Sequence, residues 1–484
     1  MQMNQSQAVT DIADTAGIGA DDVASALKFI DRNLHTRQVN KILHTFPSPR
    51  QWREKDLPAV DVLRARAQLG EPRQIGMYSS VPFCLKTNPD RCGYCLFPVE
   101  VFSGIQDLTR YFDYYQREVA LYDGLFVNDE VTNIYFGGGT SNLYRAEMYG
   151  PLMDLIRDNF NITDTATITL EGIPQLFSRE KIQAIREAGM NRISMGVQQM
   201  DDELNALSGR KQRVEHTLDA IAWSQEFGMP CNVDLIFGWP RQTVESMLAG
   251  LARVVDTGVN HITHYELNIG GGTDFAMNRQ HELPSVRENL EMYHASAEFL
   301  RGKGYRQLTA YDWELVDAGD GALYEECVRD FGSHEMFGIG YAAVSHLEPG
   351  GDHTAVSYRN SAALTDYFAR IDDRRIPAAD AYLYNDVDYR MSLLFRNLQS
   401  LNLDLASYRQ RFGVDLRDEH SGAWAALRER GFIDIEGDVL HVIGDGVFYI
   451  PMIQTLLSKN RLAEMTKEAA AQRSTRHSAL LSEL

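Results

Sequence analysis

Three cysteines lie close together in the stretch YSSVPFCLKTNPDRCGYCLF, residues 78–97. Cys84, Cys92 and Cys95 have the spacing C-x7-C-x2-C. Three thiolates suit an iron–sulfur cluster, because soft sulfur ligands bind iron well and a four-iron cluster held by three cysteines leaves one iron open. A structural zinc site is the alternative, but it takes four ligands, and the nearest histidines are not at a suitable spacing. We therefore expect a [4Fe–4S] cluster on this loop.

The chain has two other cysteines, Cys231 and Cys327, far from the cluster loop in sequence. Its first residues show no basic start and no apolar run, so they do not resemble a signal peptide. Structural disulfides are uncommon in a reducing cytosol, where grouped cysteines bind metals or take part in redox chemistry. We expect Cys231 and Cys327 to be ordinary buried or half-buried thiols.

Polar residues recur where predicted strands end, and we expect them to face one shared binding site. Three glycines and a threonine, Gly137–Thr140, directly follow a strand, and glycines let backbone amides approach a small charged ligand. A single polar residue at a strand end is commonly a cap or an ion-pair partner. The inference of a binding site therefore rests on several such residues occurring together. The other members are Glu171, Gln198, Arg210 and Asp234.

Strand-like runs alternate with helix-like segments through the middle of the chain. The runs cover residues 75–81, 131–136, 166–171, 192–197, 231–237, 261–269 and 305–311. Strands that alternate with helices form βαβ units around a parallel sheet. Six or seven such units predict an α/β barrel or partial barrel, with its site at the carboxyl ends of the strands.

The remaining sequence predicts three further units. Residues 1–72 form a helical extension whose helical character runs from about Val23 to about Phe46, where FPSPR ends it. The barrel covers 73–312, a connector covers 313–383, and residues 384–484 form a winged-helix-like domain with a polar tail. Residues 385–413 of that domain have a strongly helical pattern.

The net charge of the chain limits the classes of molecule that it is expected to bind. The chain has 47 basic and 67 acidic residues, a net charge of −20, which disfavours nucleic acid and makes the winged-helix-like domain a packing module. No apolar run is long enough to span a membrane. These features predict a cytoplasmic protein.

The motifs together resemble the radical S-adenosylmethionine enzymes, in the branch of oxygen-independent coproporphyrinogen III oxidase. The segments that carry the resemblance are the strand from Tyr78 to Cys84, FGGGTS, TLEGIP, NRISMGVQQM, SGR and NVDLIFGWP, in the family order. The resemblance covers about residues 74–455. It implies a partial (β/α)6 barrel of the TIM type, a [4Fe–4S] cluster and S-adenosylmethionine.

Residue roles follow from the same resemblance. Cys84, Cys92 and Cys95 would ligate the cluster, and Tyr94 would pack over the adenine. The positions that match S-adenosylmethionine-binding residues are Tyr78, Gly138, Gly139, Thr140, Glu171, Gln198, Arg210 and Asp234. A reductase such as flavodoxin or ferredoxin would supply the electron that cleaves the sulfonium to a 5′-deoxyadenosyl radical.

This sequence differs from the family's motifs at two places, and these differences bear on which reaction we expect. The cysteine loop is four residues longer than the family's usual C-x3-C-x2-C, which costs roughly 1 kcal/mol or less in loop entropy. Leu96 and Phe97 follow Cys95, where the decarboxylases carry a further cysteine, and their N-terminal propionate-binding motif is missing. We therefore expect a class C methyltransferase, which uses two S-adenosylmethionines to methylate an sp2 carbon of a planar conjugated molecule such as a quinone, aromatic heterocycle or tetrapyrrole.

Two alternatives remain open. One is the coproporphyrinogen oxidase-like decarboxylase itself. The other is a haem-binding chaperone, whose H-x3-Y segment has a counterpart in His261 and Tyr265. A histidine and a tyrosine that face inward from a strand are more often satisfied barrel residues than haem ligands.

Overall fold

The computed structural model describes residues 22–482, except 39–44, 53, 56, 58, 71, 89–90, 317–330, 333–334 and 351–353. Cys327 lies outside the described residues. So does the predicted end of the helical extension, apart from Thr45 and Phe46.

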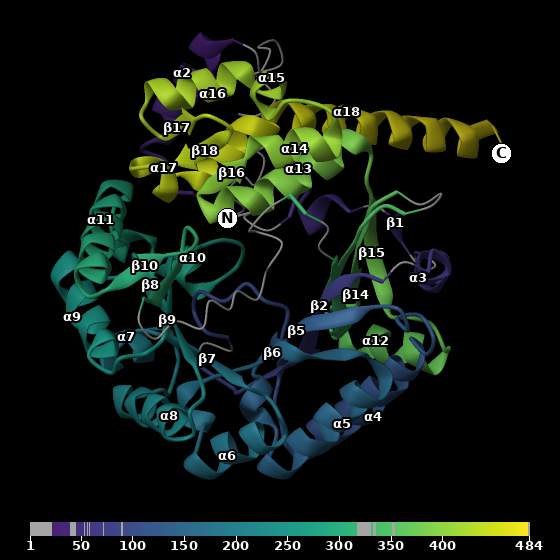
Figure 1. The fold of residues 1–484 in the computed structure, drawn as a ribbon, viewed down its shortest axis with the longest axis vertical. Coiled ribbons are helices and arrows are strands. Elements are labelled where there is room, and N and C mark those ends of the chain that lie inside the picture. Colours follow the sequence, from purple (N-terminus) through teal and green to yellow (C-terminus); the bar gives the residue numbers. More distant parts are fainter. Residues whose placement is uncertain are drawn as a thin grey trace.

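The central element is a sheet that curves into an incomplete barrel (Figure 1). Six consecutive parallel strands form most of it, and each pairs with the next along the chain. They are β2 (Gln74–Val81), β5 (Glu130–Gly138), β6 (Ile162–Gly172), β7 (Arg192–Gln198), β8 (Cys231–Phe237) and β9 (His261–Glu266). The predicted α/β partial barrel is confirmed.

Amphipathic helices cover the outside of this arc (Figure 1). Their buried faces, such as Ile182 and Ile185, join the core on the outer face of the sheet. The helices are α4 (Ile105–Ala120), α5 (Tyr149–Asn159), α6 (Arg179–Glu187), α8 (Val214–Glu226), α9 (Val244–Val255) and α11 (Val286–Gly302). Shorter elements follow the carboxyl ends of strands: β3 (Phe83–Cys84), β4 (Glu100–Val101), α7 (Asp202–Leu207) and α10 (Asp274–Asn278).

The last predicted strand, 305–311, is not a seventh barrel unit. Instead, β10 (Tyr305–Gln307) pairs antiparallel with β11 (Asp312–Leu315), and β11 pairs antiparallel with β9. The turn between them is held by Thr309, whose Oγ1 donates to Asp312 at 2.5 Å. Short apolar runs do not reveal strand direction, so the pattern alone could not show this hairpin.

The other edge of the sheet extends beyond the barrel. Next to β2 lies the parallel strand β12 (Glu335–Gly340), followed by antiparallel β13 (Val344–Leu347), β14 (Val356–Asn360) and β15 (Ala378–Leu383). Helix α12 (Leu364–Asp372) lies between β14 and β15 in sequence. The two-residue strand β1 (Glu54–Lys55), from the N-terminal extension, pairs with β15.

The N-terminal extension contacts both halves of the molecule. Helix α2 (Val23–Asn33) packs against the C-terminal helices, and α3 (Ala59–Gln68) places buried Arg66 against Asp129 and Glu335 on the barrel side. Helix α2 ends at Asn33 with a cap at Leu34 and a turn after it, so the expectation of helix running on towards Phe46 was too long where the structure describes it.

The C-terminal region packs helices around a small sheet, at the top of Figure 1. Its strands β16 (Asn402–Asp404), β18 (Val439–Val442) and β17 (Ile433–Glu436) pair antiparallel in that order. Its helices are α13 (Asp386–Asn397), α14 (Leu405–Phe412), α15 (Leu416–Glu419), α16 (Ser421–Glu429), α17 (Asp445–Phe448) and α18 (Ile450–Ser482). The predicted helix over 385–413 is interrupted, because Leu401 adopts a φ of +66° and β16 follows it. No helix in the described part of the chain could cross a membrane.

Candidate functional site

The cysteine loop begins where β2 leads into β3. Cys84 ends β3, and all three loop cysteines are free and half-buried. The backbone amide of Cys95 donates to the carbonyl of Cys92 at 2.9 Å, which holds these two residues in one turn. The loop is pinned from two sides, because Gly93 N–H donates to Ser208 at 2.9 Å and Gly93 C=O accepts from Phe275 at 2.8 Å. The two later ligands are therefore held on a braced turn.

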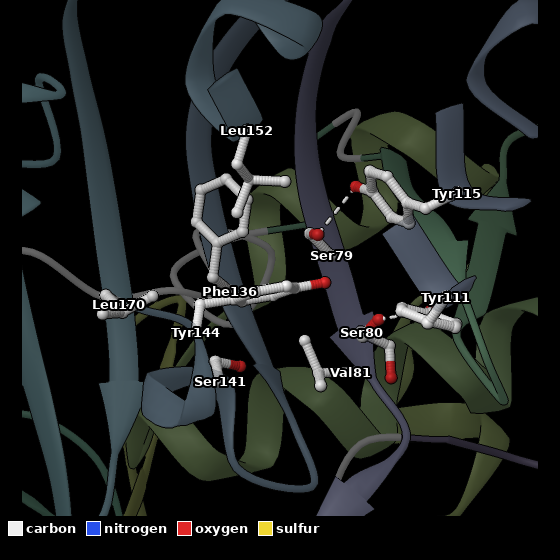
Figure 2. Close-up of a pocket in the computed structure, with 10 residues that line it drawn as sticks. All are labelled: Ser79, Ser80, Val81, Tyr111, Tyr115, Phe136, Ser141, Tyr144, Leu152 and Leu170. Carbon is white, nitrogen blue, oxygen red and sulfur yellow. Dashed lines mark hydrogen bonds between the residues drawn. The ribbon is translucent and has the colours of Figure 1, made fainter. Parts of the chain in front are cut away.

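Helix α4 fixes the strand that leads into this loop. Figure 2 shows the packing on the outer side of β2, where Tyr115 meets the hydroxyl of Ser79 at 2.7 Å. Tyr111 donates to the carbonyl of Ser80 at 2.6 Å. The hollow drawn there is lined mostly by apolar and aromatic side chains and lies behind the strand. We infer that the packing of these side chains holds β2 in place and so positions Cys84.

Burial changes the pKa of two of the three loop thiols. Burial raises the pKa of Cys84 to about 11, and burial also raises the pKa of Cys95. The free thiols of Cys84 and Cys95 therefore stay protonated at neutral pH, and a bound metal would displace these protons. Among the described residues, no three histidine, cysteine or acidic side chains could hold one metal ion together. The three ligands of a [4Fe–4S] cluster each bind a different iron.

Tyr94 and Arg210 meet beside the cysteines. Arg210 Nη1 donates to the Tyr94 hydroxyl at 3.1 Å, and the Tyr94 ring packs against Trp239 with centroids 4.9 Å apart. Phe275 completes this aromatic group, with its ring centroid 6.2 Å from that of Tyr94. Tyr94 is therefore held in place by two fully buried aromatic rings and is itself only partly buried.

Arg210 is buried and remains charged. Burial acts to lower its pKa, but Tyr94 and Cys92 more than offset this, so the pKa is raised. Its Nη2 donates to the carbonyl of Gly196 at 2.5 Å and to Gln212 Oε1 at 2.6 Å. Its buried Nε has no hydrogen-bond partner in the described structure. A buried cation with a spare donor fits the carboxylate of an amino-acid group.

The glycine run is required by close packing. A Cβ at Gly138, whose φ is +102°, would lie 2.8 Å from the Val81 carbonyl, and one at Gly139 would lie 2.5 Å from the Phe83 carbonyl. The chain thus presses against the strand that carries Cys84, and Thr140 Oγ1 then donates to Cys84 Sγ at 3.4 Å. The amide of Gly139 donates to the Val81 carbonyl at 2.6 Å and so does not face a ligand, while a ligand contact by the other amides of the run stays a prediction.

Two carboxyl groups share the inside of the barrel. Burial, strengthened by the Asp234 carboxylate, raises the pKa of Glu171 to about 8. Burial raises the pKa of Asp234 to about 6, and Asn232 Nδ2 donates to it at 2.7 Å. Tyr78 stacks on Tyr135 with ring planes 12° apart, and its pKa is raised by burial and by Glu171. The two carboxyl groups of Glu171 and Asp234 can together hold one proton near neutral pH, so one can donate a hydrogen bond and the other can accept one.

Gln198 occupies a strained position at the end of β7. Its φ is +68°, the left-handed region that a non-glycine residue enters at a cost of about 1 kcal/mol. The pairing of β7 with β8 shifts register between Gly196 and Gln198. The strand end therefore aims this side chain in a direction that a regular strand would not give.

His261 is satisfied within the barrel, as the residue pattern suggested. Its ring contacts Arg192 at 3.0 Å and Asp312 at 3.2 Å. Tyr265 keeps 38 % of its surface exposed and lies beside Tyr311, with centroids 5.3 Å apart. Cys231 is buried in the core of the barrel, as expected. Sequence reasoning missed Trp239 and Phe275, although Trp239 stands five residues after Asp234 in the quoted NVDLIFGWP motif.

Known proteins match this chain in both sequence and fold. The family model described as the radical SAM superfamily matches residues 81–254. The chain is 26 % identical over 422 residues to an oxygen-independent coproporphyrinogen III oxidase of Escherichia coli, which covers 83 % of this chain and 89 % of that relative. It is 27 % identical over 233 residues to a haem chaperone of Buchnera aphidicola, which covers 48 % of this chain and 61 % of the relative.

The solved structure of the coproporphyrinogen III oxidase from Escherichia coli has the same fold. Its TM-score is 0.74 at 24 % identity, over 87 % of this chain and 99 % of that one. The alignment thus extends well beyond the barrel strands.

Proposed function

We propose that this chain, a radical S-adenosylmethionine protein resembling the oxygen-independent coproporphyrinogen III oxidases, oxidatively decarboxylates a side chain of a reduced tetrapyrrole. The observation that carries the proposal is the match over 83 % of this chain and 89 % of the relative from Escherichia coli. The curated relatives give no support to methyl transfer, which the sequence had favoured, and fit the decarboxylase alternative better.

The cofactors are a [4Fe–4S] cluster and S-adenosylmethionine, as the radical SAM domain implies. When bound and reduced, this pair supplies a 5′-deoxyadenosyl radical. We propose that Cys84, Cys92 and Cys95 hold the cluster, supported by the braced turn and by the hydrogen bond from Thr140.

The binding roles of the other residues follow from their surroundings. We assign the methionine carboxylate to the spare Nε of Arg210, and the adenine to the ring of Tyr94, which Trp239 and Phe275 hold in place. Glu171 and Asp234 would bind ribose hydroxyls, because a half-protonated carboxyl pair both accepts and donates. Tyr78, Gly138, Gly139, Thr140 and Gln198 complete the proposed set. Thr140 is buried and the other four are half-buried, which limits the access of water to a reactive radical.

Methyl transfer is kept as a second candidate on one observation. Phe97, next but one to Cys95, is 61 % exposed and stands where the decarboxylases have a further cysteine. A haem chaperone gains no specific support, because His261 is already paired with Arg192 and Asp312.

Product analysis under anaerobic conditions tests the proposal. The reconstituted protein is given S-adenosylmethionine, dithionite, an electron acceptor and coproporphyrinogen III. Decarboxylation yields 5′-deoxyadenosine and carbon dioxide, with a tetrapyrrole that has lost a carboxyl group. S-adenosylhomocysteine with a methylated product would instead establish the second candidate. If 5′-deoxyadenosine forms and the tetrapyrrole keeps all its carboxyl groups, the decarboxylase proposal is wrong.

A further inference from the structure

A chain of mostly buried polar side chains runs through the interior of the barrel, and the proposed function uses only its last member, Asp234. The chain begins at the first residues of β7 and β9, Arg192 and His261, which are 5 % and 3 % exposed. It connects Asp234, in the middle of β8, to groups near the amino ends of the strands. We name this set the polar chain; its members, in the order in which they are bonded, are Arg192, His261, Asp312, Thr263, Asn232 and Asp234.

The direction of the hydrogen bonds is fixed at the Arg192 end of the polar chain. A guanidinium group only donates, so His261 Nδ1 accepts from Arg192 Nη2 at 3.0 Å. The ring hydrogen of His261 is then carried by Nε2, which donates to Asp312 Oδ1 at 3.2 Å. Asp312 Oδ2 accepts from the hydroxyl of Thr309 at 2.5 Å. Both oxygens of Asp312 thus have a donor without any contribution from Thr263.

Thr263 is the branch point of the polar chain. Its Oγ1 lies 3.0 Å from Asn232 Oδ1 and 3.0 Å from Asp312 Oδ1, but a hydroxyl has one hydrogen and donates to one acceptor at a time. Because other donors already supply Asp312, this hydrogen is available to Asn232. Asn232 Nδ2 then donates to Asp234 Oδ1 at 2.7 Å. The reverse orientation of the amide would place Oδ1 against Asp234 and would require a proton there, so the observed orientation belongs to an ionised Asp234.

The surroundings of the carboxyl pair favour the same distribution of charge. Burial raises the pKa of Asp234 to about 6, while hydrogen bonds from Asn232 and Thr263 act to lower it. Burial and the charge of Asp234 raise the pKa of Glu171 to about 8. The other titratable or charged groups that face the pair are Tyr78, Tyr135, Arg210, His261, Tyr265 and Asp312.

We propose that His261 and Asp312 are positioning residues for the S-adenosylmethionine site, which act through the polar chain to keep the negative charge of the carboxyl pair on Asp234. The shared proton then stays on Glu171. The inference rests on one part of the proposed function, the binding of ribose hydroxyls by Glu171 and Asp234. A carboxylate accepts from one hydroxyl and a neutral carboxyl group donates to the other, so a fixed charge distribution fixes the orientation of the ribose.

The pH dependence of S-adenosylmethionine binding tests the proposal. The dissociation constant is measured by equilibrium dialysis on the reconstituted protein, between about pH 5 and about pH 9. The wild type should bind most tightly between about pH 6 and about pH 8. Affinity should fall on the acid side as Asp234 gains a proton, and on the alkaline side as Glu171 loses one.

Two substitutions should move the acid side of this profile in opposite directions. Thr263→Val keeps the shape of the side chain and removes a donor, so the acid side should move to higher pH by roughly one pH unit. Asp312→Asn removes a negative charge that acts to raise the pKa of Asp234, so the acid side should move to lower pH. A merely structural role would weaken binding at every pH and would not shift the profile.

Matched variants separate the hydroxyl of Thr263 from general damage. Thr263→Ser keeps a hydroxyl and should return the acid side of the profile to its wild-type position. Thr217→Val removes a buried hydroxyl on the outer helix α8 that has no hydrogen-bond partner in the described structure, and should leave the profile unchanged. Every variant should contain the same iron and sulfide as the wild type.

The possible outcomes are distinct. If Thr263→Val and Asp312→Asn have the wild-type profile, or bind more weakly by the same factor at every pH, the proposal is overturned. A wild type whose affinity does not fall on the acid side would also overturn it, because Asp234 would then not act as an ionised ligand of the ribose. The anaerobic product analysis tests the decarboxylase separately. Opposite shifts in a protein that yields S-adenosylhomocysteine and a methylated product would refute the decarboxylase and support the positioning roles.

Discussion

Thr140, two residues after the end of β5, donates a hydrogen bond from its Oγ1 to Sγ of Cys84, the last residue of β3, at 3.4 Å. A hydrogen bond to a ligating sulfur favours the more negative, reduced form of a cluster. Thr140→Val keeps the shape of the side chain and removes this donor. We expect the midpoint potential of the cluster to move to more negative values, measured by redox titration with electron spin resonance.

Thr132→Val is the matched control for that change. Thr132 lies near the start of β5, the strand that leads to Thr140, and its hydroxyl donates to the Ile75 carbonyl at 3.5 Å, away from the cysteines. Its substitution should leave the potential unchanged. A Thr140→Val cluster with wild-type potential would show that the hydroxyl does not bond the ligating sulfur.

Arg210→Lys should weaken binding of S-adenosylmethionine. Lysine keeps the charge but loses the planar fork that bonds Gly196, Gln212 and Tyr94 while leaving Nε free. We expect the dissociation constant to rise at least roughly tenfold, measured by equilibrium dialysis on reconstituted protein. Arg213→Lys, at a position 66 % exposed, is the control and should bind normally. Equal affinity of Arg210→Lys and wild type would remove the carboxylate assignment.

Cys92→Ala should give a folded protein without an intact [4Fe–4S] signal in reduced-state spin resonance. The turn that holds Cys92 is made by backbone bonds and by neighbouring loops, so the fold does not depend on the thiol. Cys231→Ala, in the barrel core, should keep the signal and lose some stability through the small cavity it leaves. An unchanged cluster signal in Cys92→Ala would mean that another residue supplies the third ligand.

Glu118 should make stability depend on pH. Its buried carboxylate accepts from Tyr122 at 2.8 Å, from Asn360 at 2.9 Å, from Gly340 at 3.0 Å and from Tyr367. Burial nevertheless raises its pKa to about 7. The folded state therefore holds a proton that the unfolded state releases near pH 4.5, so this contribution is full below pH 4.5 and is lost as the pH rises towards 7.

Glu118→Gln cannot titrate and isolates that contribution. The free energy of unfolding of the wild type, minus that of the variant, should fall between pH 5 and pH 8 by about 2 kcal/mol, measured by denaturant titration. Glu130→Gln, at an exposed position, should show no such trend. A difference that stays constant over this range would indicate a carboxylate that is ionised throughout, with its pKa held low by the four donors.

The barrel was predictable because its strands are short apolar runs between well-marked helices. The run at 231–237 coincides with β8, whose two faces are both largely buried. The hairpin of β10 and β11 was not predictable, because strand direction depends on Thr309 and Asp312 meeting in a turn. The break at Leu401 inside a helical pattern was equally hidden, since its +66° φ is enforced by the packing of β16.

Some residues of the candidate site could likewise be identified from the sequence, and others could not. Cys84 could be singled out by its spacing to Cys92 and Cys95, and Arg210 and Asp234 because charged residues are costly to bury without a partner. Trp239 and Phe275 carried no such signal, because a buried aromatic residue is ordinary in any core. The purpose of Gly138 and Gly139 was also only partly visible, since the carbonyls that exclude a side chain there come from a strand some fifty residues earlier.

The pairing of β1 with β15 has a practical consequence for anyone who trims this protein. Residues 54–55 form the outermost of the thirteen strands seen in the described structure and cover the edge of β15. A fragment begun just before β2 would uncover the backbone donors and acceptors of β15, and such an open border invites a second molecule to add its own strand. Aggregation of that fragment would then result from the uncovered edge of β15 and would not show that the barrel itself is unstable.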